Sequence, residues 1–137
     1  PSQSIGLGEV GVEGEGTDLA IVTFGNGTYL SNQALPSLTQ AGIKARIVDT
    51  RWLSPLPKDA LTDAVKGCKH ILIVDETRHS GGVAEGLMAH FTETSEAKLA
   101  RLTAEDSFIA TGPAYAATMP SQDSIAKAAL DLVGAAS

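Results

Sequence analysis

The sequence predicts a three-layer α/β/α sandwich built on a mostly parallel sheet of about five strands, with one antiparallel strand at an edge. Two observations predict this fold. Short apolar runs typical of buried strands begin at residues 19, 43, 71 and 99, and their intervals fit a strand plus a crossover helix. Between these runs, apolar residues recur at the three- and four-residue spacing of an amphipathic helix. Repeated units of this kind give parallel strands joined by right-handed crossovers.

Composition and charge narrow the class of protein. The 137 residues are 43% hydrophobic and 19% charged, with a net charge of -6 and one cysteine. This usage is that of one folded domain, and the negative charge disfavours nucleic acid and anionic membrane surfaces as partners. No apolar run reaches the roughly 18 residues of a membrane span. A lone cysteine fits a reducing compartment, so we expect a cytoplasmic protein.

The first residues differ in composition from the rest. Residues 1–18 are rich in glycine, contain four acidic residues and have no Lys or Arg. We expect them to form an extended linker that leads into a domain over residues 19–137. Because the first residue is Pro1 and not Met, we also expect the chain to be cut from a longer protein.

Three elements are expected at the start of the domain. Residues 19–24 are almost all apolar, as in a strand buried on both faces. A helix is expected over 28–40, although Pro36 should kink or split it. The strand over 43–49 alternates polar and apolar residues, which is typical of a position nearer the edge of a sheet.

The middle of the chain repeats the pattern. A helix should begin at Pro57, since proline suits the first turn of a helix, and its apolar spacing makes Cys68 a core residue. The run over 71–74 is the most apolar strand and should be central. A polar loop is expected over 75–82.

The last part of the chain closes the sheet. A helix around 84–91 and a strand over 98–102 complete the repeated units. Residues 103–119 lose the pattern, because a Gly-Pro pair forbids regular structure there, and a short edge strand is expected within them. Ser121 is a suitable N-cap for a final helix.

A glycine-rich turn follows the first strand. Gly25 and Gly27 lie between the strand and a helix, and Asp49 ends the next strand, which is most of a dinucleotide-binding fingerprint. Leu30 takes the place of the third glycine. A simple strand-to-helix turn is therefore the favoured interpretation, and nucleotide binding is the alternative.

The loop after the most apolar strand is the strongest candidate for a contact site. It leads into a helix N-terminus at the carboxyl end of its strand, where open α/β sheets bind ligands and anions. Adjacent glycines can expose backbone amides, and the cations can hold a carboxylate or a phosphate. An interface with a neighbouring domain is favoured, an anion site is the alternative, and a solvated loop comes third. The candidate residues are Glu76, Arg78, His79, Ser80, Gly81 and Gly82.

Arg51 and Glu76 are expected to form a structural ion pair. They follow the second and third strands, and the carboxyl ends of parallel strands emerge at the same edge of a sheet. If those strands are neighbours, the side chains can meet, and Arg51→Ala should then destabilise the fold more than Arg46→Ala does.

The sequence offers no other chemistry. His70 and His90 are expected to be edge residues of a strand and a helix. Zinc-ligand spacing, a nucleophile elbow and a P-loop are all absent from the sequence. We therefore assign no catalytic, cofactor-binding or metal-ligating residue to this chain.

Separated motifs resemble one family. Together they are similar to the C-terminal domain of the transketolase superfamily, above all in beta subunits, or beta-like regions, of the thiamine-diphosphate-dependent component of 2-oxoacid dehydrogenase complexes. The resemblance covers nearly the whole chain from about residue 5, although Asp75 stands where His is common. The motifs are GEGTDLAIVTFG at 14–25, VDTRWLSPL at 48–56, IVDE at 73–76 followed by GG and E, and MPSQDSI at 119–125.

The resemblance implies a role within a longer enzyme. Full enzymes of the family decarboxylate a 2-oxoacid on thiamine diphosphate, and those of the dehydrogenase complexes pass the acyl group to a lipoyl arm on an acyltransferase. The G-D-G motif that holds magnesium and diphosphate is absent from this sequence. Both cofactors are therefore expected in the parent enzyme, outside this chain, which would serve as a supporting and assembly domain that is inactive alone.

The resemblance also implies partners. These are other domains or an alpha subunit of the same enzyme, a homologous subunit in a dimer, and a dihydrolipoyl acyltransferase. Two alternatives stay open. One is the equivalent domain of a transketolase or a deoxyxylulose-phosphate synthase. The other, from a different class, is a free-standing nucleotide or small-anion binding module that uses Gly25, Gly27 and Asp49 or the Arg78 loop.

Overall fold

The computed structural model describes residues 4–134, which form five strands, four α-helices and one 3₁₀-helix. The strands are β1 (Gly11–Glu13), β2 (Leu19–Thr23), β3 (Ala45–Asp49), β4 (His70–Arg78) and β5 (Lys98–Ala104). The helices are α1 (Asn26–Gln40), α2 (Lys58–Ala64), α3 (Val83–Thr94) and α4 (Gln122–Gly134), and the 3₁₀-helix η1 covers Gly112–Ala117.

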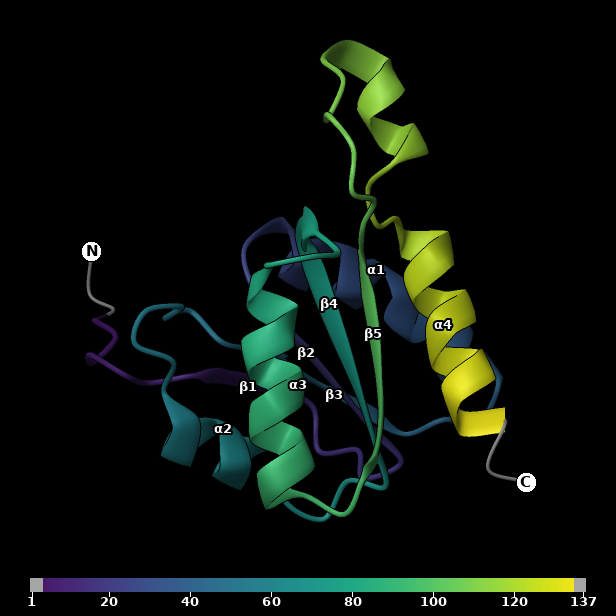
Figure 1. Cartoon of the computed structure of the whole chain (residues 1–137). Helices are drawn as coiled ribbons and strands as arrows, with labels where there is room; N and C mark the ends of the chain where they lie inside the picture. The colour runs from purple at the N-terminus through teal and green to yellow at the C-terminus, as the bar shows by residue number, and fades with distance from the viewer. Residues whose placement is uncertain (1–3, 135–137) are drawn as a thin grey trace.

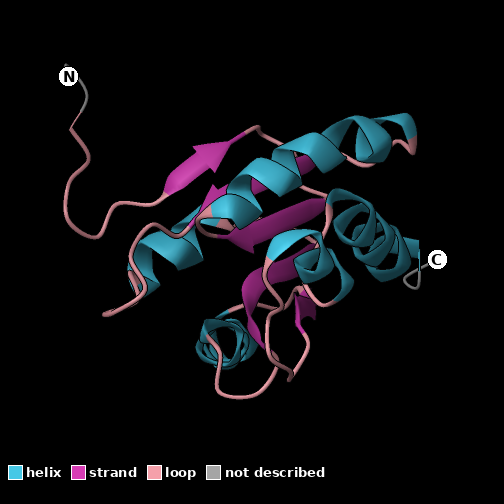
Figure 2. Ribbon diagram, turned by 90° about the horizontal axis from the view of Figure 1, so that it is seen from above, coloured by secondary structure: helices cyan, strands magenta, loops and turns pink. Residues whose placement is uncertain are grey.

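The strands form one sheet in the order β1-β3-β2-β4-β5. β1 is antiparallel to β3, and every other neighbouring pair is parallel. Helices α1 and α4 cover one face of the sheet, while α2 and α3 cover the other (Figures 1 and 2). The predicted three-layer sandwich with one antiparallel strand is confirmed.

Burial on both faces explains why the inner strands are continuous apolar runs. All five residues of β2 are buried. Leu19 and Ile21 belong to the core under α1 and α4, whereas Ala20 and Val22 belong to the core under α2 and α3. Successive side chains of a strand point to opposite faces, so each layer of helices packs on its own set of β2 residues.

The antiparallel edge strand lies elsewhere than expected. It is β1, within the segment 1–18 that was predicted to be a linker, and not a strand within 103–119. β1 pairs through its backbone with β3, and its side chains at Val12 and Glu13 are exposed. No apolar alternation therefore signals it in the sequence.

Residues 105–120 form a protruding arm in place of the predicted edge strand. The arm rises beyond the end of β5, carries η1, and returns to α4 (Figure 1). A single backbone hydrogen bond, from the Glu105 amide to the Thr118 carbonyl at 3.0 Å, closes its base. No residue of η1 is buried.

Two other elements differ from expectation. α1 runs unbroken through Pro36, which is exposed on the helix, so the loss of one backbone hydrogen bond at this proline does not end the helix. β4 continues to Arg78, through half of the predicted loop, with a register irregularity between Asp75 and Arg78. β4 also lies one place from the middle of the sheet, which β2 occupies.

Removing Arg46 should cost more stability than removing Arg51, the reverse of the expectation from sequence. Arg46 donates to the Gly16 carbonyl at 2.6 Å and to the Ala64 carbonyl at 3.1 Å, and so ties β3 to the chain before β2 and to the end of α2. We expect Arg46→Ala to lower the free energy of unfolding by about 1.5–3 kcal/mol, and Arg51→Ala by less than about 1 kcal/mol. Urea unfolding of the two variants checks this, and equal losses would contradict it.

Candidate functional site

The carboxyl ends of the four parallel strands meet at one edge of the sheet, which we call the carboxyl edge. Figure 1 shows it at the top of the molecule, where the arm emerges beside the loop between β4 and α3. Ligand sites of open α/β sheets lie at such an edge. The candidate loop predicted from the sequence therefore does lie where a site would be.

Asp75 fixes the path of the chain from β4 into α3. Its side chain is fully buried, and its two carboxylate oxygens accept from the backbone amides of Thr77 and Ala84, both at 2.7 Å. Gly82, at the N-cap of α3, supplies no side-chain bond to the helix. A carboxylate from the preceding strand thus satisfies the first turn of α3 and suits the positive end of its dipole.

Gly82 is required by the closeness of this turn. A Cβ at this position would lie 2.5 Å from the Thr77 hydroxyl and 2.6 Å from the Arg78 carbonyl oxygen. The neighbouring Gly81 has a φ of 69°, in the left-handed region that favours glycine. The glycine pair predicted to expose amides to a ligand therefore serves a tight return of the backbone.

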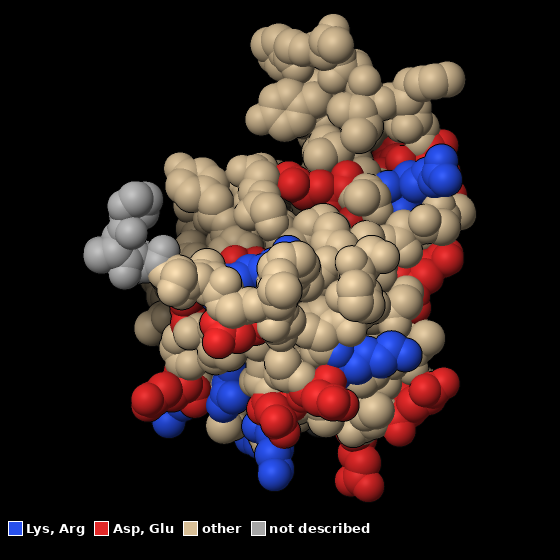
Figure 3. All heavy atoms as spheres, turned by 90° about the vertical axis from the view of Figure 1, so that its left-hand side faces the viewer, with Lys and Arg blue, Asp and Glu red and all other residues tan. Residues whose placement is uncertain are grey.

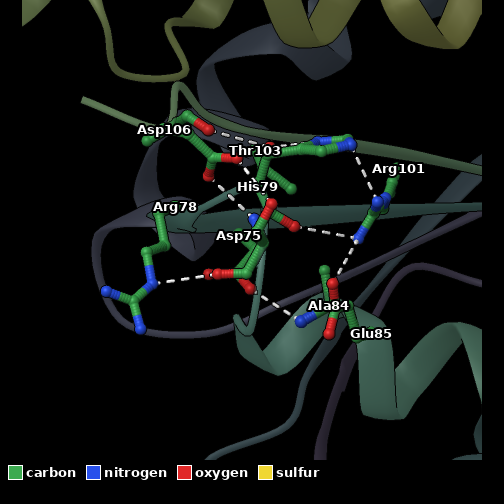
Figure 4. Close-up of polar contacts among 10 residues, drawn as sticks. Asp75, Arg78, His79, Ala84, Glu85, Arg101, Thr103 and Asp106 are labelled. Atoms are coloured by element: carbon green, nitrogen blue, oxygen red, sulfur yellow. Dashed lines mark hydrogen bonds and ion pairs between the residues drawn. The ribbon is translucent and has the colours of Figure 1, made fainter.

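A polar network joins the same loop to β5 (Figure 4). Arg101 approaches Nε2 of His79 at 2.8 Å and donates to the His79 carbonyl at 3.1 Å. Because a guanidinium only donates, Nε2 must accept, and the proton of the neutral ring sits on Nδ1, which donates to the Thr103 hydroxyl at 3.0 Å. Arg101 also lies 3.8 Å from Glu85 of α3. His79 is thus held as a structural acceptor.

Ser80 ties the loop to the root of the arm. Its hydroxyl and its backbone amide donate to Asp106, at 2.5 Å and 2.8 Å respectively. The hydroxyl bond first, and the amide bond second, hold the pKa of the Asp106 carboxyl below its ordinary value. The loop and the base of the arm are therefore one bonded unit.

Arg78 points away from this network. Its Nε donates to the Ser80 carbonyl at 2.9 Å, and Figure 4 shows its guanidinium on the side of the loop opposite Arg101. Within residues 4–134, the terminal nitrogens of Arg78 have no hydrogen-bond partner. Of the candidate residues, Arg78 is the one that offers an unused charge to another molecule.

The predicted pair of Arg51 with Glu76 does not form. β2 lies between β3 and β4, so the two side chains are not neighbours. Among the described residues, Arg51 pairs with Asp49 at 3.5 Å, and Glu76 accepts from the Asn26 amide at 2.9 Å. The premise that the two strands are adjacent was wrong.

The turn at Gly25 is built for packing. The amides of Gly27 and Thr28 donate to carbonyls of the turn itself, and a Cβ on Gly27 would overlap the Thr23 hydroxyl. The Glu76 carboxylate lies beside this turn through its bond to Asn26. A phosphate here would find bonded amides and a negative charge, which argues against the nucleotide alternative.

The remaining polar candidates have structural contacts. His70 donates from Nδ1 to the Asp18 carbonyl at 2.8 Å, and Nε2 of His90 bonds the Thr62 hydroxyl at 3.0 Å. Cys68 is buried as predicted, and burial raises the pKa of its thiol, which disfavours the reactive thiolate.

Within residues 4–134, no cluster of His, Cys, Asp and Glu could hold a metal, and no helix is long and apolar enough to cross a bilayer.

Comparison with known proteins agrees with this architecture. Residues 8–125 match the family model of the transketolase C-terminal domain. The chain belongs to this family. The resemblance based on motifs is thereby confirmed. The carboxyl edge is therefore part of a transketolase C-terminal domain.

Relatives of this transketolase C-terminal domain come from several enzymes. It is 30% identical over 130 residues to the pyruvate dehydrogenase E1 component subunit beta of Bacillus subtilis. This alignment covers 92% of this chain and 40% of that subunit. It is 31% identical over 111 residues to the 1-deoxy-D-xylulose-5-phosphate synthase of Halothermothrix orenii. This alignment covers 80% of this chain and 17% of that protein. The chain thus spans less than half the length of these relatives.

A solved structure shows the same fold. The chain superposes with a TM-score of 0.85 on a split gene transketolase described as an inactive beta4 tetramer. The match covers 98% of this chain and 44% of that one, at 21% sequence identity. At this identity the likeness speaks for the fold alone.

Sequence reasoning missed several residues of the carboxyl edge. Asp106 is the second residue after β5, at the same edge as the candidate loop, so the strand-end rule could have found it. Arg101 lies within a strand and has no such signal. The exposure of Phe108 on the arm has no signal in the sequence either, because an apolar residue in an irregular segment can be buried or exposed.

Gly82→Ala should destabilise the domain, whereas Gly86→Ala should not. The added methyl at Gly82 meets backbone within 2.6 Å and should lower the free energy of unfolding by about 1–3 kcal/mol. At Gly86, inside α3, it meets only the Leu56 side chain at 3.4 Å and should raise stability by about 0.5–1 kcal/mol. Urea unfolding compares the two, and a tolerated Gly82→Ala would show that the turn has room.

Asp106→Asn should destabilise the domain in a pH-dependent manner. Since the folded pKa of Asp106 is lowered, its bonds to Ser80 stabilise the fold fully above about pH 4 and are lost as the pH falls through the lowered pKa. The difference from wild type, measured by urea unfolding, should be present at pH 7 and shrink towards about pH 3. Glu105→Gln, at the exposed neighbour, is the control. A pH-independent difference would contradict the assignment.

Proposed function

We propose that this chain is the C-terminal supporting and assembly domain of a thiamine-diphosphate-dependent 2-oxoacid dehydrogenase component. It supplies subunit contacts and has no catalytic activity alone. The similarity to a pyruvate dehydrogenase beta subunit along 92% of the chain supports this choice within the family. We propose a cytoplasmic enzyme, in keeping with the single buried cysteine.

The state of the carboxyl edge carries the proposal. In an α/β domain that binds its own ligand, this edge presents free amides and open polar groups. Here the amides of Gly27 and Thr28 in α1, and of Ala84 and Glu85 in α3, are bonded within the chain, and the carboxylates of Glu76 and Asp75 lie beside them.

The hydroxyls of Thr23, Thr28, Thr50 and Thr77 have no hydrogen-bond partner within residues 4–134, but they are buried. The exposed groups that remain available at this edge include Arg78 and the uncovered arm, and we infer that these contact another polypeptide.

The described residues do not fit thiamine diphosphate with magnesium. Magnesium needs carboxylate or carbonyl ligands gathered at one point, and residues 4–134 contain no such cluster of acidic side chains. The diphosphate needs free amides or cations, and at the carboxyl edge the Arg78 guanidinium is accompanied by the carboxylates of Asp75, Glu76 and Asp106, while Arg51 is paired with Asp49. We therefore place both cofactors in a part of the parent enzyme other than this chain.

Candidate partners follow from the same surface. The loop over Glu76–Gly82 would contact a preceding domain, an alpha subunit or a homologous subunit, with Arg78 as its charged contact and His79 and Ser80 holding it in shape. We also propose a dihydrolipoyl acyltransferase as a docking partner, on the resemblance to dehydrogenase beta subunits. The second candidate function is the equivalent domain of a 1-deoxy-D-xylulose-5-phosphate synthase, favoured by 31% identity over 111 residues.

The chain should not bind the cofactor that its parent enzyme uses. Calorimetric titration of the chain with thiamine diphosphate and Mg²⁺ should show no saturable heat, because residues 4–134 hold no acidic cluster for Mg²⁺ and the amides of Gly27, Thr28, Ala84 and Glu85 are bonded within the chain. The full-length parent, as the positive control, should bind and should decarboxylate one of pyruvate, a branched-chain 2-oxoacid or 2-oxoglutarate. Saturable binding at one site per chain, or a parent that decarboxylates none of these acids, would refute the proposal.

A further inference from the structure

Residues 4–13, which end with β1 and which we call the strap, are attached to the sheet mainly through their backbone. Within the strap, Gly11 alone is buried and Val10 alone is half-buried, whereas Ile5, Leu7 and Val12 are exposed. Figure 3 looks onto this side of the molecule and shows uncharged side chains across its middle, with charged side chains gathered below them. The strap therefore adds almost nothing to either core, and segments with few buried apolar contacts open most easily.

One side chain reaches from the body of the domain onto β1. A Cβ at Gly11 would lie 2.6 Å from Nη2 of Arg51 and 2.9 Å from its Cζ. The Arg51 guanidinium thus lies against the backbone of Gly11, in the space that a side chain would take. Gly11 is not among the glycines with a positive φ, so its own conformation does not require glycine. The close approach of Arg51 is what requires it.

Asp49 fixes the direction of the Arg51 side chain. Its carboxylate lies 3.5 Å from Nε of Arg51 and accepts from the Arg51 backbone amide at 3.2 Å. Asp49 is also the residue of β3 that stands opposite Gly11 in the register of the two strands. The guanidinium is thereby held across the edge of β3 and against β1.

The backbone at Arg51 is strained in this position. Its φ is 58°, and within residues 4–134 it is the only residue other than glycine with a positive φ. The Trp52 amide donates to the Thr50 carbonyl at 2.6 Å, so the chain turns within three residues. A glycine would relieve the strain but would carry no guanidinium. Strained residues of this kind are concentrated at clamps and switches.

We propose that the strap opens as a unit while the rest of the domain stays folded, and that Arg51 is the clamp that holds it closed. Arg46 anchors the chain just beyond the strap, through its bond to the Gly16 carbonyl at 2.6 Å. Gly14, with a φ of 83°, lies between this anchor and the strap and serves as the hinge. The inference goes beyond the proposed function, because the clamp sets how firmly residues 4–10 are attached whichever enzyme the domain serves.

Hydrogen–deuterium exchange of the purified chain, followed by NMR at single amides, tests the strap. The amides by which β1 pairs with β3 should exchange about 100-fold or more faster than those of β2, which are exposed only by unfolding of the whole domain. Arg51→Gly should speed the exchange of β1 by about 3- to 5-fold, the size of a lost exposed charge contact. It should not speed the exchange of β2, because glycine relieves the strained φ in the folded domain.

A double-mutant cycle tests the clamp. Gly11→Ala places a methyl where the guanidinium lies, so it should speed the exchange of β1 by at least as much as Arg51→Gly does. In the Arg51→Gly background the methyl meets no guanidinium, since all three of the nearest atoms belong to Arg51. The second substitution should then change the exchange of β1 by less than about 2-fold.

Arg78→Ala is the matched control, because Arg78 is another arginine of the carboxyl edge and bonds the Ser80 carbonyl of its own loop. It should leave the exchange of β1 unchanged, and circular dichroism should show all variants folded. Amides of β1 that exchange as slowly as those of β2 in the wild type would overturn the strap. A Gly11→Ala effect that persists in full without Arg51 would overturn the clamp. Either result would leave the cofactor titration of the chain and its parent unaffected.

Discussion

The burial of β2 and β4 on both faces is the constraint on which the rest of the domain depends. Six successive residues of β4, His70 to Asp75, are buried, as are all five of β2. Such strands need helices on both sides, and parallel strands must be joined by crossovers. The connecting turns are thereby placed at the two ends of the strands. The carboxyl ends of the parallel strands, where α/β sheets bind ligands, are all gathered at the carboxyl edge.

This constraint explains which parts of the fold were predictable. Apolar runs revealed β2 and β4, and the helical spacing around Leu61 and Leu87 revealed α2 and α3, because burial acts directly on those residue types. β1 pairs only through its backbone and exposes Val12, so its sequence carries no signal. The order of strands was not predictable either, since chain order does not determine neighbours, and the Arg51–Glu76 pair failed for that reason.

The candidate site shows a similar division. Its position followed from the strand-end rule, but its use did not. Asp75 caps α3, Gly82 allows a close turn, and His79 accepts a hydrogen bond from Arg101. Glycine and histidine are typical of anion-binding loops, but here they stabilise the shape of one loop. Only contacts, and not residue identities, separate these two uses. These contacts support the proposal that the domain contributes a shaped surface to a longer enzyme whose chemistry lies in other parts.

The hydrogen bonds from Ser80 to Asp106 affect the loss of conformational entropy when another molecule binds to the arm. They hold the root of the arm against the loop, whereas residues beyond it lack a core. Any molecule that grips the arm must immobilise it, and each rotamer-rich side chain that is ordered costs about 0.5–1.5 kcal/mol. Because the root is already fixed, this loss of conformational entropy falls only on the tip of the arm.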